Sequence, residues 1–183
     1  DLDKDASTKC HSCSAGAFSK AGATACEKCA AGKADKDQKQ STPCESCKTG
    51  KYSGVGKSEC TDCAKGKADT DKDASTACKA CSAGSFAAAG VTTCSQCASG
   101  TADLDKDAST GCASCSAGSY SKAAASVCTQ CASGTADLDK DASTECKACP
   151  AGTFSKAAAT ACGKCAAGMA DLDSKPSTAC KAC

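Results

Sequence analysis

Apolar residues along this chain follow neither the 3.6-residue period of a helix nor the two-residue alternation of a strand for more than a few positions. The alanine-rich stretches at 121–126 and 155–161 come closest to a helical turn. The stretch at 53–56 has the corresponding place in another part of the chain and reads Ser-Gly-Val-Gly, which favours a loop. The pattern therefore predicts loops and short β-strands with little helix.

The regularity of the chain lies in its cysteines. All 22 fall in CxxC pairs, and the gaps between successive pairs alternate strictly between 12 and 14 residues. The result is a 34-residue repeat, and a fixed period of this size is typical of a stacked array. The pairs are Cys10 and Cys13, Cys26 and Cys29, Cys44 and Cys47, Cys60 and Cys63, Cys78 and Cys81, Cys94 and Cys97, Cys112 and Cys115, Cys128 and Cys131, Cys146 and Cys149, Cys162 and Cys165, and Cys180 and Cys183.

This period divides the chain into five whole repeats and two partial ones. Residues 1–9 would end a preceding repeat and residues 180–183 would begin the next, so we expect the chain to belong to a longer array. The whole repeats are 10–43, 44–77, 78–111, 112–145 and 146–179.

The composition cannot supply an ordinary hydrophobic core. There are four leucines, three valines, no isoleucine, no tryptophan and five aromatic residues among 183. Burying a large apolar side chain contributes about 1.5 to 3 kcal/mol, whereas ordering the backbone costs about 1 to 2 kcal/mol per residue. Cross-links through cysteine must therefore hold the fold together.

Disulfides and zinc are the two cross-links that CxxC pairs allow. The spacing C-x2-C-x12-C-x2-C is close to that of a four-thiolate zinc site. The pairs nevertheless run on without a break instead of forming groups of four cysteines, and eleven pairs is an odd number. We therefore favour disulfides, each closing a loop of about 15 residues and contributing about 3 kcal/mol. An intracellular zinc-binding array is the alternative.

Two further positions are fixed relative to each CxxC pair. A serine or threonine stands two residues before every pair, and a glycine stands three residues after each of the first ten. We expect a tight turn in which the glycine has positive φ, or lets a disulfide pass close to the backbone, while the hydroxyl binds a local main-chain group. The turn glycines are Gly16, Gly32, Gly50, Gly66, Gly84, Gly100, Gly118, Gly134, Gly152 and Gly168.

The two halves of each repeat differ two residues after this glycine. In one half the residue is aromatic, and in the other half it is alanine. Packing of the rings on neighbouring disulfides is favoured over a role in stacking a ligand. We expect each ring to be the small core of its repeat: Phe18, Tyr52, Phe86, Tyr120 and Phe154.

An acidic string, DLDKDAST or a variant of it, fills the 14-residue gap. Asp103, Asp105 and Asp107, and likewise Asp137, Asp139 and Asp141, match the opening of a calcium-binding EF-hand loop. The glycine and glutamate that complete such a loop are replaced in the first of these copies by Ala108 and Ser114. These six aspartates are the calcium candidates, but a solvated acidic turn is the favoured interpretation. No cofactor is expected.

Charge and composition argue against several functions. Lysines and acidic residues balance to a net charge of +1, without the concentrated basic face that nucleic acid requires. The single histidine, His11, has no copy in the other repeats, so we predict no enzymatic activity. No stretch of the sequence is apolar enough to cross a membrane.

The pattern [ST]-x-C-x-x-C-x-x-G-x-[FY]-S resembles the ephrin-receptor-like cysteine-rich repeat, a relative of tumour-necrosis-factor-receptor and EGF-like modules. The segment 146–165, CKACPAGTFSKAAATACGKC, carries the likeness well, and the pattern covers essentially the whole chain. The resemblance implies disulfides, an elongated rod and an extracellular setting, with no specific ligand. The acidic strings depart from the family, which usually has a second aromatic residue there.

Two disulfide connectivities remain open. In one, Cys13 pairs with Cys26 and Cys29 with Cys44, so that Cys10 and Cys183 are left over. In the crossed arrangement of the related receptors, Cys10 would pair with Cys26 and Cys13 with Cys29, so that Cys180 and Cys183 are left over.

The near-identity of the repeats indicates the class of function. The segment ASGTADLDKDAST occurs unchanged at 98–110 and 132–144, whereas a receptor would need one surface unlike the others. We therefore expect an elongated disulfide-rich solenoid, extracellular or at the cell surface, that self-associates into a fibre, filament or surface appendage. The alternative is the stalk of a receptor or adhesin. With no asparagine in the chain, O-glycosylation is the expected decoration, at Thr8, Thr24, Thr42, Thr76, Thr110, Thr144 and Thr178.

Overall fold

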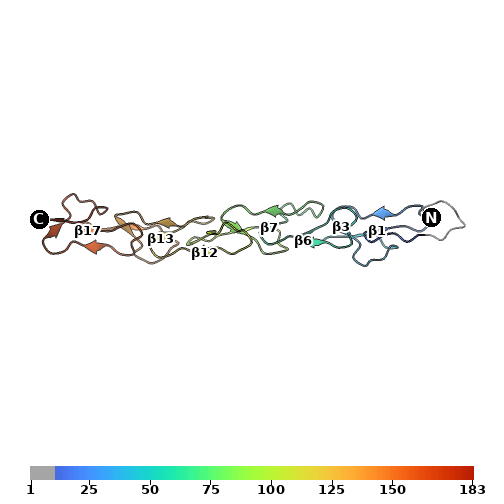
Figure 1. Ribbon diagram of the computed structural model, residues 1–183, viewed down its shortest axis with the longest axis horizontal. Coiled ribbons are helices and arrows are strands. Elements are labelled where there is room, and N and C mark those ends of the chain that lie inside the picture. Colours follow the sequence, from blue (N-terminus) through green and yellow to red (C-terminus); the bar gives the residue numbers. More distant parts are fainter. Residues whose placement is uncertain (1–10) are drawn as a thin grey trace. The chain divides into compact units, whose positions relative to one another are not determined.

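The computed structural model describes residues 11–183. These residues contain loops and two-residue β-strands and no helix, in agreement with the predicted class (Figure 1). The described residues divide into two compact units, unit 1 at 11–81 and 87–94 and unit 2 at 82–86 and 95–183. No helix of the described part is long and apolar enough to span a membrane.

Every strand pairs antiparallel with its neighbour in sequence, so the structure is a series of small hairpins. In unit 1 the pairs are β1 (Ala17–Phe18) with β2 (Glu27–Lys28), β3 (Lys33–Ala34) with β4 (Glu45–Ser46), β5 (Lys51–Tyr52) with β6 (Thr61–Asp62), and β7 (Lys67–Ala68) with β8 (Lys79–Ala80). In unit 2 they are β9 (Ser85–Phe86) with β10 (Ser95–Gln96), β11 (Thr101–Ala102) with β12 (Ala113–Ser114), β13 (Ser119–Tyr120) with β14 (Thr129–Gln130), β15 (Thr135–Ala136) with β16 (Lys147–Ala148), β17 (Thr153–Phe154) with β18 (Gly163–Lys164), and β19 (Met169–Ala170) with β20 (Lys181–Ala182).

The repeated sequence explains both strands of each hairpin. One strand directly follows the turn glycine, and the other consists of the two residues between the cysteines of a CxxC pair. All ten predicted turn glycines have positive φ, from 75° to 86°. The N–H after the glycine donates to the carbonyl three residues earlier, as from Ser119 to Ser116 at 3.0 Å. Glycine is the third of the four residues of this turn, and that position requires positive φ.

Ten disulfides link consecutive CxxC pairs without crossing. The second cysteine of each pair bonds to the first cysteine of the next, at sequence separations of 13 and 15 residues in alternation. Side chains three residues apart in extended backbone point to opposite sides, so the two cysteines of one pair reach different partners. Cys183 is unpaired and exposed, and Cys10 lies outside the described residues. Of the two open connectivities, the structure has the first.

All ten bonds follow this rule. They are Cys13–Cys26, Cys29–Cys44, Cys47–Cys60, Cys63–Cys78 and Cys81–Cys94 in unit 1, and Cys97–Cys112, Cys115–Cys128, Cys131–Cys146, Cys149–Cys162 and Cys165–Cys180 in unit 2.

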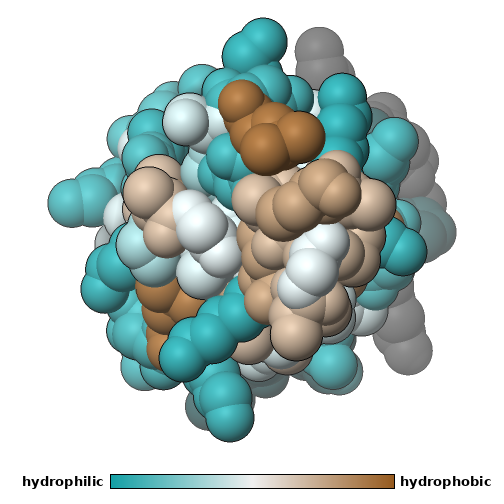
Figure 2. Space-filling view, turned by 90° about the vertical axis from the view of Figure 1, so that its left-hand side faces the viewer, coloured by the Kyte–Doolittle hydropathy of each residue, from teal (hydrophilic) through white to brown (hydrophobic). Residues whose placement is uncertain are grey.

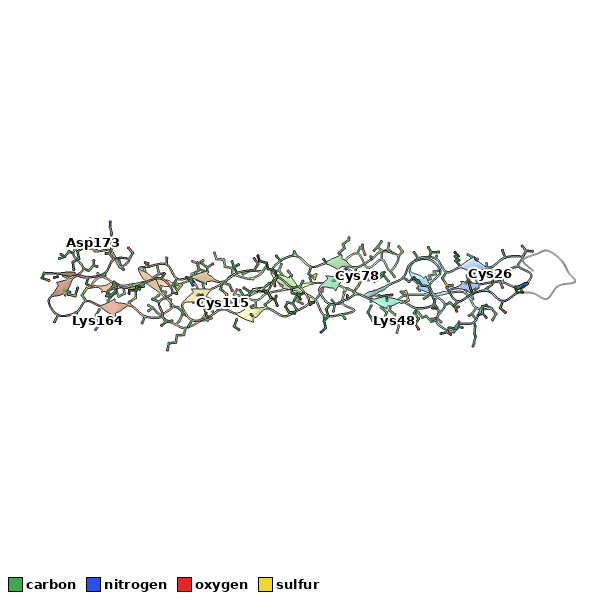
Figure 3. All side chains as sticks on the ribbon, in the orientation of Figure 1. Cys26, Lys48, Cys78, Cys115, Lys164 and Asp173 are labelled. Atoms are coloured by element: carbon green, nitrogen blue, oxygen red, sulfur yellow. A yellow bond between two sulfur atoms is a disulfide. The ribbon has the colours of Figure 1, made fainter. Side chains whose placement is uncertain are left out.

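The most deeply buried side chains belong to cysteine and alanine. Cys63 and Ala68 in unit 1, and Cys131 and Ala136 in unit 2, are at most 1% exposed. Figure 3 shows the side chains along the ribbon, where the labelled Cys26, Cys78 and Cys115 are of intermediate exposure and Lys164 and Asp173 are exposed. Small buried side chains let neighbouring backbones approach closely. The core of each unit is therefore built from disulfides and alanines more than from large apolar groups.

The predicted aromatic core is only partly realised. Phe18 is buried at 9% exposure, but the other four rings, from Tyr52 to Phe154, are of intermediate exposure. In the other half of the repeat, the alanines from Ala34 to Ala136 are fully buried, and Ala170 is of intermediate exposure. The aromatic rings are thus less buried than these alanines.

Candidate functional site

The feature that recurs most regularly is the contact between successive half-repeats. We call each half-repeat, from one CxxC pair to the next, a coil. In unit 2, Gly134 N–H donates to Ser155 O at 3.1 Å, and Ala158 N–H donates back to Cys131 O at 2.8 Å. In unit 1 the same pair of bonds joins Gly32 to Ser53 at 2.9 Å and Gly56 to Cys29 at 2.8 Å. Backbone hydrogen bonds thus join each coil to the next one in addition to the hairpin pairing between them.

The turn glycines also lie against the coil that comes second after their own. A Cβ on Gly84 would overlap with the carbonyl of Ala124, and a Cβ on Gly118 would overlap with that of Ala158. The turn requires positive φ at these positions, and the neighbouring coil requires that no side chain be present. The repeated glycine predicts either positive φ or a disulfide that passes close to the backbone. The neighbour is instead the backbone of another coil.

Buried aspartates complete the contact. Asp103 and Asp137 are 6% and 5% exposed, and their carboxylates accept hydrogen bonds from Gly84 N–H at 3.2 Å and Gly118 N–H at 3.1 Å. In unit 1, Asp69 accepts in the same way from Gly50 N–H at 3.0 Å. Each carboxylate reaches back 19 residues to the turn of an earlier coil. A buried N–H would otherwise lack a partner.

These buried aspartates correct one part of the sequence interpretation. The acidic string was expected to be a solvated turn throughout, but its first aspartate is buried in each copy from Asp35 to Asp137. Invariance did not mark it, because the second aspartate of the string is also present in every copy, from Asp37 to Asp173, and is exposed. Nothing in the spacing alone shows that the carboxylate reaches a glycine in another coil.

The remaining aspartates of the string stay exposed and organise its loop. Asp105 accepts hydrogen bonds from Asp107 N–H at 3.0 Å and from the Thr110 hydroxyl at 2.9 Å. These two bonds, the backbone one first, lower the pKa of Asp105 below its usual 3.8. Bonds from the Ser143 hydroxyl and then its N–H lower the pKa of Asp141 likewise. Donors favour the charged form of a carboxylate.

The calcium candidates divide between these two roles. Asp103 and Asp137 face the turn glycines, whereas Asp105 and Asp139 accept from the threonines that precede the CxxC pairs. Asp107 accepts from Ser109 N–H at 2.9 Å. In the part of the chain that the structure describes, no three histidine, cysteine, aspartate or glutamate side chains are placed to hold a metal ion.

The predicted role of the hydroxyl residues is realised where the acidic string precedes them. Thr110 also donates to Asp107 O at 2.9 Å, and Thr144 donates to Asp141 O at 3.0 Å. Thr42, Thr76 and Thr178 form the equivalent bonds. Thr24, a further glycosylation candidate, is exposed, and Thr8 lies outside the described residues.

Comparison with known proteins adds no relative. No protein-family model matches the chain, and no curated protein matches it. Function must therefore be argued from the repeated coil contact itself.

Proposed function

We propose that this chain is an extracellular structural protein. Its repeats build a disulfide-linked rod that forms, or contributes to, a fibre, filament or surface appendage. From the resemblance to ephrin-receptor-like repeats we take only the disulfide-linked modular architecture. It assigns no catalytic activity, no cofactor and no nucleic-acid partner to the chain.

The observation that carries the proposal is the repetition of one contact. The same Gly-to-Asp bond is present at Gly50, Gly84 and Gly118, and the same cross-coil backbone bonds recur with each repeat. A binding or catalytic protein needs one place where the pattern is broken by a distinctive group of side chains. Repetition of one contact instead allows a chain to be extended by copying it.

The ten disulfides support the location. Disulfides persist in oxidising surroundings such as the extracellular space, and they are rare where thiols are kept reduced. They also suit a load-bearing role, because each coil remains covalently tied to the next if its hydrogen bonds open. Exposed positions between the strands include many lysine, aspartate, serine and threonine residues, which suits a surface in contact with water.

An antibody raised against the chain tests this function in the source cells. Intact, unpermeabilised cells should bind it, and immunogold micrographs should show the label along fibres or appendages at regular intervals. Label that appears only after permeabilisation would contradict the proposal and favour the intracellular thiol-rich array. Label confined to a membrane-anchored protein with a separate binding head would favour the receptor stalk.

A further inference from the structure

One place in unit 1 departs from the uniformity of the repeats. Four of its charged residues stand at positions where every other copy of the repeat has an uncharged residue: Lys36, Lys48, Lys51 and Glu59. In the other copies the place of Lys36 is held by leucine or threonine, that of Lys48 by serine or proline, and that of Lys51 by alanine, serine or threonine. The place of Glu59 is held by alanine, threonine or valine. The fold of the repeat therefore does not require these charges.

The structure brings the same four residues around one cavity at the surface of unit 1. The cavity has a volume of about 390 Å³ and is lined by Lys36, Lys48, Lys51, Glu59 and Cys60. Lys36 comes from one coil, and the other charged residues come from the next coil. The volume is at the lower end of the range of small-molecule sites, about 300 to 1,000 Å³. All four departures from the repeat thus converge on one place.

A disulfide holds two sides of this cavity together. Cys47 and Cys60 are bonded, with their Cα atoms 5.7 Å apart. Lys48 directly follows Cys47 in sequence, and Glu59 directly precedes Cys60. The backbones that carry these two charged side chains are therefore fixed beside a covalent cross-link. A site whose backbone is fixed in advance loses less conformational freedom when it binds a ligand.

Hydrogen bonds and ion pairs position the other two lysines. Lys36 Nζ donates to Ser46 O at 2.8 Å and lies 3.7 Å from Glu45 Oε2. Lys51 Nζ lies 2.7 Å from Asp62 Oδ1, on the paired strand. Both carboxylates are more than half exposed, so these are weak surface pairs. Because an ammonium group has three N–H donors, each lysine keeps at least one for a further acceptor.

Lys48 and Glu59 have no such partner. Neither forms an ion pair with a residue that the structure describes, and both are exposed. Lys48 is labelled in Figure 3. A lysine side chain only donates hydrogen bonds, and an ionised glutamate only accepts them. The cavity therefore offers several donors and, at one side, a single free acceptor.

The surroundings of the cavity are more basic than the corresponding surface of unit 2. Among the described residues, unit 1 has twelve lysines and nine acidic residues, whereas unit 2 has eight lysines and nine acidic residues. In unit 2 the place of Lys36 is held by Leu104 and Leu138, which are 50% and 45% exposed. Exposed apolar groups are also visible in Figure 2, which views the molecule from the side that carries the C-terminus.

We propose that this cavity binds a sugar that carries a sulfate or phosphate ester. The three lysines bind the ester oxygens, and Glu59 accepts a hydrogen bond from a sugar hydroxyl. A free sulfate ion would occupy only the lysine side and would be repelled by Glu59, whereas a sugar hydroxyl supplies the donor that Glu59 lacks. The site goes beyond the proposed structural role and does not depend on it. On an extracellular rod, it would attach the rod to an acidic polysaccharide.

Titration of the full, disulfide-bonded chain with glucose 6-sulfate and with glucose 6-phosphate tests the site. NMR of the backbone amides should show saturable shifts at Lys48, Lys51 and Glu59. Salt at about 0.15 M confines charge interactions to about 8 Å. A site for phosphate esters should bind glucose 6-phosphate more tightly as the pH rises through about 6, where the second phosphate proton leaves. A site for sulfate esters should prefer glucose 6-sulfate throughout that range.

Two variants with the same change of charge separate the cavity from general attraction. Lys48→Ser should weaken the binding of the preferred ester about fivefold. Lys65→Ser is the matched control and should leave binding unchanged, because Lys65 is an exposed lysine of unit 1 that does not line the cavity. Both variants should fold, since Ser82 and Ser99 hold these places in the next repeat. Equal losses from the two variants would overturn the proposal.

Glu59→Ala should act in opposite directions on two probes. It removes the acceptor for the sugar hydroxyl and should weaken the binding of the ester. It also removes a repelling charge and should strengthen the binding of inorganic sulfate. Alanine holds this place at Ala25 and Ala161, so the variant should fold. Tighter binding of both probes, or no saturable shift with either ester, would overturn the proposal and leave the structural role standing, because that role rests on the repeated coil contact.

Discussion

Two separate constraints require glycine at position 118: a positive φ and the close approach of a neighbouring backbone. In the sequence both are visible only as a glycine at a fixed distance from each CxxC pair. The φ of Gly118 is 78°, and a Cβ would overlap with the Ala158 carbonyl, whereas Gly152 at φ 75° has open space. Gly118→Ala should therefore destabilise unit 2 by about 2 kcal/mol more than Gly152→Ala, since both share the backbone strain but only one is overpacked. Chemical denaturation with the disulfides intact measures the difference. Equal losses would mean that the neighbouring coil moves aside.

Asp103 supplies the only side-chain acceptor that the structure gives Gly84 N–H. Asp103→Ala should expose that amide to exchange and cost about 1 to 3 kcal/mol, because a buried donor is left unpaired. Asp103→Asn is the matched control, since its amide oxygen can still accept. Hydrogen exchange at the Gly84 amide, followed by NMR, is the measurement. Unchanged protection in the alanine variant would contradict a role for this carboxylate in joining coils.

The loop of Asp105 predicts a pH dependence with a definite sign. Bonds from Asp107 N–H and then the Thr110 hydroxyl lower the pKa of Asp105 in the folded chain below 3.8. The group therefore stabilises the fold above its unfolded pKa, and this contribution is lost as the pH falls through the folded pKa. Thr110→Val removes one donor and should raise the pKa towards 3.8. NMR titration of the carboxyl carbon measures it, and an unmoved midpoint would contradict the assignment.

Residue by residue, the sequence was a good guide wherever a local rule applied. Positive φ at Gly84 and Gly118 follows from turn chemistry, and the bond from Thr110 to a nearby carbonyl follows from its position before a CxxC pair. The reach of Asp103 to Gly84 could not be predicted, because it joins residues in different coils. Such a contact depends on how the coils pack, which no local spacing encodes.

At the scale of the element, each disulfide should stabilise its own hairpin. Cys97 and Cys112 are 15 residues apart, with β11 between them and β12 directly after Cys112. Replacing both with alanine should cost about 3 kcal/mol by the loop-closure estimate. Hydrogen exchange should rise in 101–114, while β17 and β18 of the same unit remain protected. A uniform rise across unit 2 would show that the coils unfold together and not one by one.

The sequence predicted short strands and loops, but it did not show which residues form each hairpin. Absence of helical periodicity indicated loops and short strands, and the CxxC pairs indicated where cross-links lie. The second strand of each hairpin, such as Ala113–Ser114, falls between two cysteines and has no apolar alternation that would mark it. Its extended form follows from the need to direct two side chains to opposite sides. The choice between crossed and uncrossed disulfides depends on that geometry.

At the scale of the whole chain, composition excluded an apolar core but did not identify what replaces it. Aromatic residues drew attention because they are the largest apolar groups, yet Ala102 and Ala136 are fully buried and Tyr120 is not. Where backbones pack against each other, small side chains are favoured over large ones. A repeat held by disulfides, glycines and alanines thus places its bulkier groups nearer its surface.

Intact mass and disulfide mapping of the native protein test the central claim most directly. The account predicts that alkylation without reductant leaves the 20 bonded cysteines unmodified, and that every mapped bond joins the second cysteine of one CxxC pair to the first of the next, as in Cys97–Cys112. Crossed bonds such as Cys97 with Cys115 would contradict the fold. Alkylation of all 22 cysteines after removal of bound zinc would contradict the entire account.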